Sequence, residues 1–223
     1  MKMVHIELDN AIISNQDVFT EWIIELPVVM TKYVQELWHQ CSGGEGRFVL
    51  SQGDKEIDLS KKIELIMNLF MIEINGRKIL NKLYSELDKI SKTETMYMQT
   101  LKIARDIKEY ILSLEYEADY SLEFETELDV PGLLKIAGVK YEETEIDFLE
   151  KLIRYIKIIV RVLSIKVIVF INLRSYLSET QMQEVIKEIE YQEIQAIFME
   201  NQERVGLEGG KRYIIDKDQC EIY

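Results

Sequence analysis

The sequence has few cysteines, prolines and glycines, and each scarcity excludes a class of protein. Its two cysteines, Cys41 and Cys220, form no Cys-x-x-Cys pair, so neither a zinc knuckle nor a disulfide framework is expected. Two prolines and ten glycines are too few for long disordered or low-complexity tracts. The cysteine usage fits the reducing cytoplasm, where we therefore expect the protein to act.

Long apolar runs are also missing, which argues against a membrane-spanning helix. The most apolar stretch, residues 157–173, is interrupted by Arg161 and Lys166 and falls short of the roughly 18 apolar residues that a span requires. Residues 1–8 lack the apolar core of a signal peptide. The sequence therefore predicts a soluble protein with no membrane partner.

Catalytic motifs are absent as well. There is no Gly-x-Ser-x-Gly and no His-Glu-x-x-His motif, so hydrolase and zinc-protease functions have no support. Two glycine-rich stretches, SGGEGRF (42–48) and GLEGGKR (206–212), each lead into a strand-like run. A phosphate cradle needs its amides at a helix N-terminus instead. The sequence therefore predicts no nucleotide turnover, and we expect a protein that is not an enzyme.

Acidic residues outnumber basic ones, 40 against 27, which gives a formal net charge of −13. This charge argues against nucleic acid as a partner, although a local basic surface can exist on an acidic body. Arg154, Lys157 and Arg161 form such a candidate surface, because an expected helix over residues 145–163 places them on one face. Two interpretations stay open: a solvated face supported by a Glu150–Arg154 pair, or a surface that contacts phosphates.

Residues 113–129 hold seven carboxylates and no basic residue. All seven occupy odd positions: Glu115, Glu117, Asp119, Glu123, Glu125, Glu127 and Asp129. The even positions between them are apolar apart from Thr126, so the pattern predicts an extended chain with one charged face. That face is either solvated or compensated by a cation. Oxygen ligands without histidine or cysteine favour Ca²⁺ or Mg²⁺, and a flexible carboxylate cluster suits Ca²⁺ better.

Hydrophobic periodicity predicts an α/β fold built from both ends of the chain. Residues 166–172 (KVIVFIN) and 194–200 (IQAIFME) are apolar runs typical of strands buried on both sides of a sheet. A helix that begins near Ser178 separates them, which completes a βαβ unit. We expect an α/β head domain of residues 1–92 and 165–223, with an inserted helical leg domain of residues 93–164 that carries the acidic segment.

Three stretches, taken in their order along the chain, resemble one known protein family. They are SLEFETELDVPGLLKIAGVKYE (121–142), FLEKLIRYIK (148–157) and KVIVFINLRSYLSETQMQEVI (166–186). Together they resemble the small spacer-acquisition (adaptation) protein of type II-A CRISPR systems, over about residues 110–200. No single motif carries the resemblance; the order of the segments does.

The resemblance implies a non-catalytic DNA-binding protein of antiviral defence. It implies a ring-shaped homotetramer whose subunits combine a helical leg with an α/β head, similar to nucleotide-binding folds but without a Walker loop. The ring is expected to bind Ca²⁺ and to hold the ends of double-stranded DNA in its central hole without reading the sequence. The CRISPR integrase and the effector nuclease are the expected protein partners.

The resemblance also implies site residues. Metal ligands are expected at Glu117, Asp119 and Glu123, with Glu125 or Glu127 joining them. DNA contacts are expected at Lys135 and Lys140, which match basic positions of the family, and at the stripe of Arg154, Lys157 and Arg161. Ser121 stands where the family commonly has an aspartate, which leaves the number of bound ions open.

Two rival functions stay open at this point. The first is a metal-dependent nuclease that uses the carboxylates of residues 115–129 to hold two Mg²⁺ ions. It would need acids that converge with a general base or an orienting lysine, whereas the acidic segment offers repeats along one run. The second is a protein-interaction scaffold whose acidic residues are only solvated.

Overall fold

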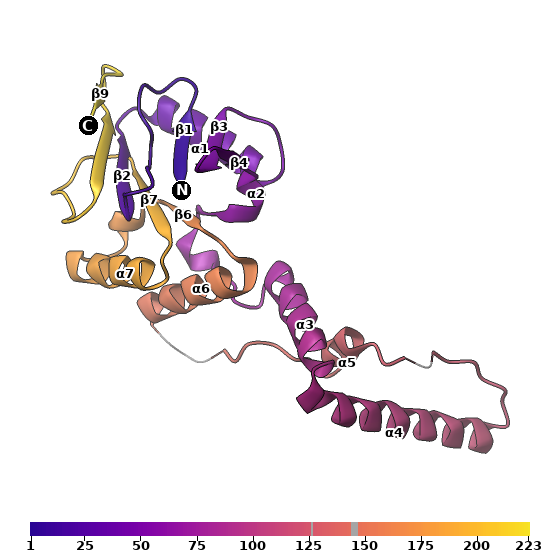
Figure 1. The fold of residues 1–223 in the computed structure, drawn as a ribbon. Coiled ribbons are helices and arrows are strands. Elements are labelled where there is room, and N and C mark those ends of the chain that lie inside the picture. Colours follow the sequence, from indigo (N-terminus) through magenta and orange to yellow (C-terminus); the bar gives the residue numbers. More distant parts are fainter. Residues whose placement is uncertain (126, 144–146) are drawn as a thin grey trace. The chain divides into compact units, whose positions relative to one another are not determined.

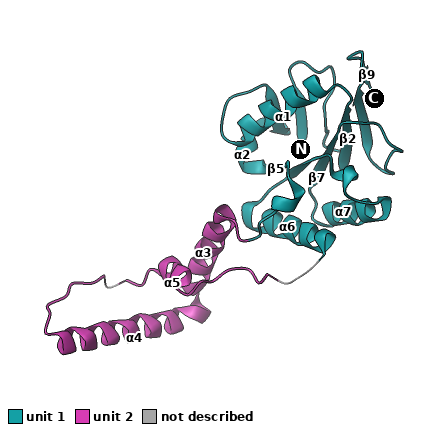
Figure 2. Cartoon of the chain, turned by 180° about the vertical axis from the view of Figure 1, so that it is seen from behind, with its two compact units in different colours: residues 1–74, 145–223 teal, residues 75–144 magenta. Residues whose placement is uncertain are grey.

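The computed structural model describes residues 1–125, 127–143 and 147–223 (Figure 1). The fold is of the α/β type, as predicted. The chain forms two compact units: unit 1 contains residues 1–74 and 145–223, and unit 2 contains residues 75–144 (Figure 2). Unit 1 is therefore built from both ends of the chain.

The main sheet of unit 1 has, among the described residues, the strand order β5-β6-β7-β2-β8-β9. Its strands are β2 (Phe19–Ile24), β5 (Ile63–Ile66), β6 (Val167–Ile171), β7 (Gln195–Glu200), β8 (Lys211–Ile215) and β9 (Glu221–Ile222). Neighbouring strands are parallel, except that β9 is antiparallel to β8. Every residue of β2 and β7 is buried, as expected for the middle of a parallel sheet that is covered on both faces.

The predicted βαβ unit is confirmed. Strands β6 and β7 pair in parallel, and α7 (Glu179–Tyr191) connects them. Ser178 and Gln181 form a capping box at the start of α7: the Ser178 hydroxyl accepts the Gln181 N–H, and the Gln181 side chain accepts the Ser178 N–H. Two short 3-10 helices, η1 (Leu69–Met71) and η2 (Leu173–Ser175), follow β5 and β6.

One face of the main sheet packs against α1 (Pro27–Cys41) and a second, antiparallel sheet. The second sheet has the order β1 (Lys2–His5), β3 (Phe48–Gln52) and β4 (Lys55–Ile57), and α2 (Leu59–Lys62) follows it. Trp22 of β2 is fully buried here, with its ring centroid 5.2 Å from that of Tyr33 on α1. Aromatic burial of this kind ties the small sheet and α1 to the main sheet.

The opposite face carries a row of phenylalanines from three neighbouring strands. The ring centroid of Phe198 lies 5.5 Å from that of Phe19 and 5.6 Å from that of Phe170. Helices α6 (Phe148–Leu163) and α7 lie on this side, away from α1 (Figures 1 and 2). The expected leg domain of residues 93–164 includes α6, whereas α6 belongs to compact unit 1, because side chains such as Leu152 and Ile156 are fully buried.

Unit 2 contains α3 (Arg77–Ser91), α4 (Glu94–Ala118) and α5 (Val130–Ile136). Helix α3 packs against α5. The Tyr84 hydroxyl donates to the carbonyl of Val139 at 2.8 Å, which ties α3 to the segment after α5. The Asn75 side chain accepts the N–H of Tyr141 at 2.8 Å and donates to its carbonyl at 3.0 Å. These contacts hold the start of α3 beside residues 139–143.

Candidate metal and nucleic-acid sites

The first half of the acidic segment is helical, and the predicted extended ladder is wrong there. Glu115 and Glu117 lie in the last turn of α4, which ends at Ala118, and Asp119 follows in the left-handed conformation at φ 55°. The apolar stripe of α4 extends through Leu114, so helix formation overrides the period of two. An α-helix turns by about 200° over two positions, so residues that are two positions apart point to nearly opposite sides. Glu115 and Glu117 therefore share no face.

The second half of the segment keeps the predicted alternation only from Glu123 onward, because Tyr120 and Leu122, at even positions, are 69% and 45% exposed. Phe124 and Leu128 are half-buried, whereas Glu123, Glu125 and Glu127 are exposed. Phe124 faces α4, because the Nζ atom of Lys108 lies 5.9 Å from its ring centroid. A cavity of about 40 Å³ lies here, lined by Ala104, Ile107, Lys108, Ile111, Phe124, Glu125, Glu127 and Leu128. Thr126, the one polar residue at an even position, is outside the described residues.

The predicted metal ligands fit a hard cation by their chemistry but not by their arrangement. Carboxylate oxygens are the donors that Ca²⁺ prefers. In the described ranges 1–125, 127–143 and 147–223, however, no three His, Cys, Asp or Glu side chains are grouped so that they could hold a metal ion. Glu115 instead accepts the N–H of Leu122 at 3.0 Å, and Glu117 and Asp119 are exposed. The described part of the single chain therefore does not bring three of these ligands together.

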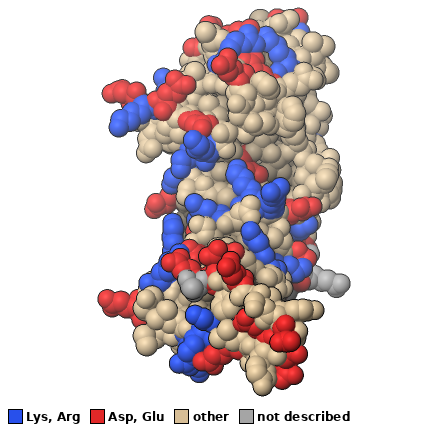
Figure 3. Space-filling model, turned by 90° about the vertical axis from the view of Figure 1, so that its right-hand side faces the viewer, with Lys and Arg blue, Asp and Glu red and all other residues tan. Residues whose placement is uncertain are grey.

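The predicted DNA-contacting residues are distributed over both units. In unit 2, Lys135 is exposed at the end of α5, and Lys140 is exposed with its Nζ 3.7 Å from the Glu143 carboxylate. In unit 1, Arg161 and Lys157 are exposed on α6, but Lys157 lies 3.5 Å from Glu188 of α7. Arg154 is half-buried on the same helix. Figure 3 shows basic side chains interspersed with acidic ones, so positive charge on that face is local.

Sequence reasoning missed a further basic surface on α3. Arg77, Lys78, Lys82 and Lys89 are all exposed, and none forms an ion pair with any residue in the described part of the chain. The signal was present in the sequence, because these residues recur at helical spacing opposite the apolar residues Ile79, Leu83, Leu87 and Ile90.

The glycine-rich stretches occupy positions where no phosphate cradle forms. Residues 43–46 join α1 to β3, and residues 206–210 join β7 to β8, so neither stretch precedes a helix. Helix α1 follows the central strand β2 most directly, and it begins after Leu26 with Pro27 in its first turn. Proline has no N–H to offer to a phosphate. This geometry agrees with the predicted absence of a Walker loop in the described residues.

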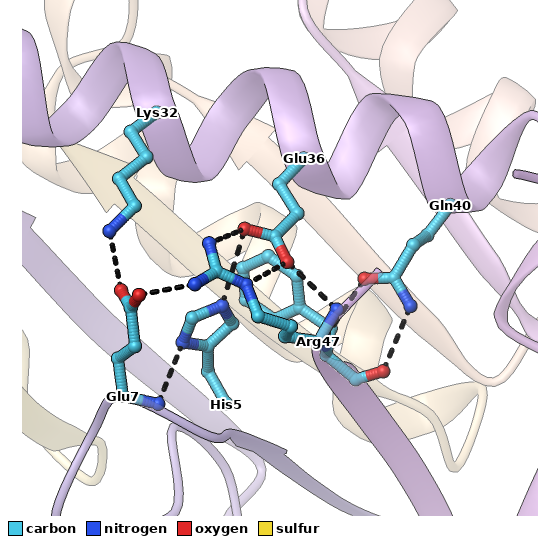
Figure 4. A network of polar contacts seen from close by, with 7 residues as sticks. His5, Glu7, Lys32, Glu36, Gln40 and Arg47 are labelled. Atoms are coloured by element: carbon cyan, nitrogen blue, oxygen red, sulfur yellow. Dashed lines mark hydrogen bonds and ion pairs between the residues drawn. The ribbon is translucent and has the colours of Figure 1, made fainter. Parts of the chain in front are cut away.

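One polar network fixes α1 to the small sheet (Figure 4). The Arg47 guanidinium donates two hydrogen bonds to Glu36, at 2.9 and 2.6 Å, and the Arg47 N–H adds a third at 2.7 Å. These bonds lower the pKa of Glu36 to about 2. Burial lowers the pKa of His5, whose Nδ1 accepts the N–H of Glu7 at 3.2 Å. The His5 side chain is fully inaccessible, so its role is structural.

A second network lies at the carboxyl end of the parallel strands. Glu21 and Glu200 are each 1% exposed, on β2 and β7, and the Arg174 guanidinium pairs with Glu21. Glu200 accepts the Arg174 N–H at 3.0 Å, while its second oxygen has no hydrogen-bond partner in the described residues. Burial raises the pKa of Glu200. Glu21 also accepts the N–H of Leu207 at 3.2 Å, so the network holds the loop between β7 and β8.

Comparisons with known proteins identify the family. No helix among the described residues is long and apolar enough to cross a bilayer. The chain is similar to the CRISPR-associated protein Csn2 of Streptococcus agalactiae, with 24% identity over 167 residues that cover 74% of each chain. It is also similar to cbiO1 from Clostridium perfringens, part of the ABC transporter complex cbiONQ, with a TM-score of 0.45 and 13% identity, covering 92% of this chain and 76% of that one.

The family comparison covers most of the sequence and confirms the resemblance seen in the three stretches. A family model described as CRISPR-associated protein (Cas_Csn2) matches residues 40–219 of the 223-residue chain. The match includes the acidic segment, the basic stripe of α6, and all strands of the main sheet except β2 and β9. The chain therefore belongs to the Cas_Csn2 family of CRISPR-associated proteins.

Proposed function

We propose that this protein acts in CRISPR spacer acquisition by binding the ends of double-stranded DNA, without catalysis and without reading the sequence. The functional form is a homotetrameric ring that Ca²⁺ stabilises. Membership of the Cas_Csn2 family over residues 40–219 carries the adaptation role. The CRISPR integrase and the effector nuclease are the protein partners in this proposal. The features that support each part lie in α4, in the acidic segment and on the basic surfaces.

Self-association is supported by the exposed apolar surface of α4. This helix has 25 residues, and none of the residues that it contributes is buried. Leu101 and Leu112 lie within about 20° of each other on one side of the helix. Ile103, Tyr110 and Leu114, all at least 45% exposed, lie within about 40° on another side. Apolar side chains on two sides of one helix favour contacts with other subunits over a solvated helix.

Calcium is supported by the unfavourable placement of charge in unit 2. Glu115, Glu117 and Asp119 cluster at the C-terminal end of α4, where the helix dipole disfavours negative charge, and the last turn has no basic residue. In the proposal, Glu117, Asp119 and Glu123, with Glu125 or Glu127, hold the ion, which would supply charge neutralisation. Because the single chain does not gather these carboxylates, the site forms on assembly.

DNA binding without sequence reading is supported by the kind of residues at the proposed contacts, of which all but the half-buried Arg154 are exposed. Lys135, Lys140, Arg154, Lys157 and Arg161 are the proposed phosphate contacts, and side chains that contact phosphates position DNA without specifying its sequence. The net charge of −13 discourages DNA from binding elsewhere on the surface. Binding of this kind is expected to weaken steeply as salt increases.

The absence of catalysis is proposed from the positions of the acidic residues. A two-metal nuclease needs carboxylates that converge on one point, about 4 Å from a second metal position. The acidic side chains of residues 115–125 and 127–129 instead face solvent or the backbone of Leu122. Incubating linear and supercoiled DNA with Mg²⁺ or Mn²⁺ should leave both intact. Cleavage that disappears in Glu123→Ala would establish the nuclease instead.

The central experiment compares blunt linear duplex DNA with a nicked circle of the same sequence, in Ca²⁺ and in EGTA. We expect tight binding of the linear form in Ca²⁺ only, because a ring loads over free ends. Sedimentation in the same buffers should show a mass that falls when EGTA removes the ion. Equal affinity for both DNA forms would contradict end binding, and an unchanged monomer in both buffers would contradict the ring.

A further inference from the structure

Helix α3 has one buried face and one charged face. Ile79 and Tyr84 are buried, and Leu80, Leu83 and Leu87 are half-buried, so the apolar side packs within unit 2. Contacts at Asn75 and at the Tyr84 hydroxyl attach the helix to residues 139–143. A helix that is fixed in this way presents its other face in a defined orientation.

The exposed face combines lysines and an arginine with small polar residues. Arg77, Lys78, Lys82 and Lys89 are exposed together with Asn81 and Ser85. At 100° per residue, these six side chains fall within about 140° of the helix circumference. Lys78 and Lys89 are separated by about 16 Å along the axis. The face therefore forms a straight basic stripe, which we call the α3 stripe.

The charges of the α3 stripe are not balanced within the chain. None of its four basic residues forms an ion pair with a residue that the structure describes. Of the two acidic residues on α3, Asp88 is paired with Lys92 at 2.8 Å, and Glu86, one turn after Lys82, is half-buried and forms no ion pair with the stripe in the described residues. On α6, by contrast, Lys157 lies 3.5 Å from Glu188. The α3 stripe is thus more available to an anionic ligand than the stripe of α6.

Two of these charges work against the helix that carries them. Arg77 and Lys78 occupy the first turn of α3, where the helix dipole favours acidic residues, and that turn contains none. The N-cap residue Gly76 offers no side-chain hydrogen bond to compensate. Basic residues at this position therefore do not serve the stability of α3. A polyanionic partner gives them a role that the isolated chain does not.

We propose that the α3 stripe binds the phosphate backbone of double-stranded DNA, an inference that rests on the proposed function. Lysine ammonium groups are point charges that suit phosphates without selecting bases, and Asn81 and Ser85 can donate hydrogen bonds to phosphate oxygens. A stripe of about 16 Å spans several phosphates of one duplex, because B-DNA carries about one charge per 1.7 Å of its axis.

The test replaces three lysines of the stripe, in Lys78→Gln/Lys82→Gln/Lys89→Gln. A matched control replaces three exposed lysines of unit 1 that have no ion pair in the described residues, in Lys55→Gln/Lys187→Gln/Lys217→Gln. Both variants change the net charge from −13 to −16, because three positive charges are lost. A third variant, with arginine at positions 78, 82 and 89, keeps the charge.

The readout is the affinity for a blunt duplex in Ca²⁺ as a function of salt. In the stripe variant, the slope of log K against log salt should become shallower by up to about 2.7, or about 0.9 per lost contact. We expect the control and the arginine variant to keep the slope of the wild type. Sedimentation and circular dichroism confirm that the variants fold and assemble alike.

Each result separates the two proposals. A wild-type protein that fails to bind duplex DNA would overturn the proposed function and this inference with it. Wild-type binding with an unchanged slope in the stripe variant would overturn the inference alone. If the stripe variant loses binding to a polyglutamate probe but not to DNA, the stripe serves an acidic protein and the inference is wrong.

Discussion

Glu36 and Glu200, whose pKa values are shifted in opposite directions, both lie in unit 1. Arg47 holds the pKa of Glu36 low, whereas burial raises the pKa of Glu200. Each network joins segments that are distant in the sequence, since Arg174 and Glu21 are 153 residues apart. Removing one partner of such a buried pair leaves the other uncompensated, which is costly. These contacts therefore hold together segments of the α/β unit.

The Glu36–Arg47 contact predicts a defined dependence of stability on pH. The pKa of Glu36 falls from 4.5 to about 2 on folding, so the contact stabilises the fold above about pH 5 and is lost as the pH falls toward 2. Because the Arg47 side chain is 41% exposed, we expect a contribution of only about 1–2 kcal/mol. Urea unfolding of Glu36→Gln should show this loss at pH 7 and little difference from the wild type at pH 2.

A control for this prediction is Glu45→Gln, in the loop between α1 and β3. Glu45 is exposed and forms no ion pair in the described part of the chain. Its replacement should leave the stability difference between pH 7 and pH 2 as it is in the wild type. A parallel loss of stability at both pH values in Glu36→Gln would instead mean that packing, and not charge, is responsible.

At the scale of elements, sequence periodicity predicted the interior better than the surface. The apolar runs of β6 and β7 predicted strands that are buried on both faces, because such runs are typical of a parallel sheet covered on both sides, and both strands are buried in this way. In residues 113–118, by contrast, the alternating pattern also fits the end of an amphipathic helix, and the cooperativity of α4 decided the outcome. Local periodicity takes no account of a helix that has already formed upstream, and the predicted alternation holds only from Glu123 onward.

The dipole of α4 gives opposite predictions for carboxylates at its two ends. Glu117→Gln, in the last turn, should stabilise the calcium-free protein by about 0.3–1 kcal/mol, because an unfavourable charge is removed. The same variant should show a smaller rise in Tm when Ca²⁺ is added, because a proposed ligand is lost. Differential scanning calorimetry in EGTA and in Ca²⁺ measures both effects.

The matched variant is Glu94→Gln, in the first turn of the same helix. There the acidic side chain interacts favourably with the dipole, so its loss should lower the Tm in EGTA. The rise caused by Ca²⁺ should stay that of the wild type. Equal responses of Glu117→Gln and Glu94→Gln to Ca²⁺ would remove Glu117 from the proposed metal ligands.

At the scale of the whole molecule, the net charge argues against DNA as a ligand, and the local arrangement of basic residues supports it. The net charge of −13 averages over a surface that includes the α3 stripe, whose basic residues form no ion pair within the described residues. The sequence identified the stripe of α6 but not its pairing with Glu188, because that contact joins two helices. The geometry of the proposed metal site was likewise beyond sequence reasoning, and in the described residues no three His, Cys, Asp or Glu side chains are grouped to hold an ion.

Assembly through α4 is tested by making its exposed apolar sides polar. Leu101→Gln/Leu112→Gln changes one side, and Ile103→Gln/Leu114→Gln changes the other. All four side chains are 45–46% exposed in the single chain, so each double variant should alter monomer stability by no more than about 1 kcal/mol. If both sides contact other subunits, each variant should reduce the mass seen by sedimentation in Ca²⁺.

The control for assembly uses apolar residues that are exposed on unit 1, in Ile6→Gln/Val28→Gln. These side chains are 77% and 81% exposed, so the control removes at least as much accessible apolar surface as either test variant. Its mass should equal that of the wild type, because a single apolar residue on a surface needs no partner. Wild-type mass in both α4 variants would contradict assembly through this helix. A reduced mass in only one of them would assign the contact to that side, since the two sides lie nearly opposite each other, about 160° apart on the helix.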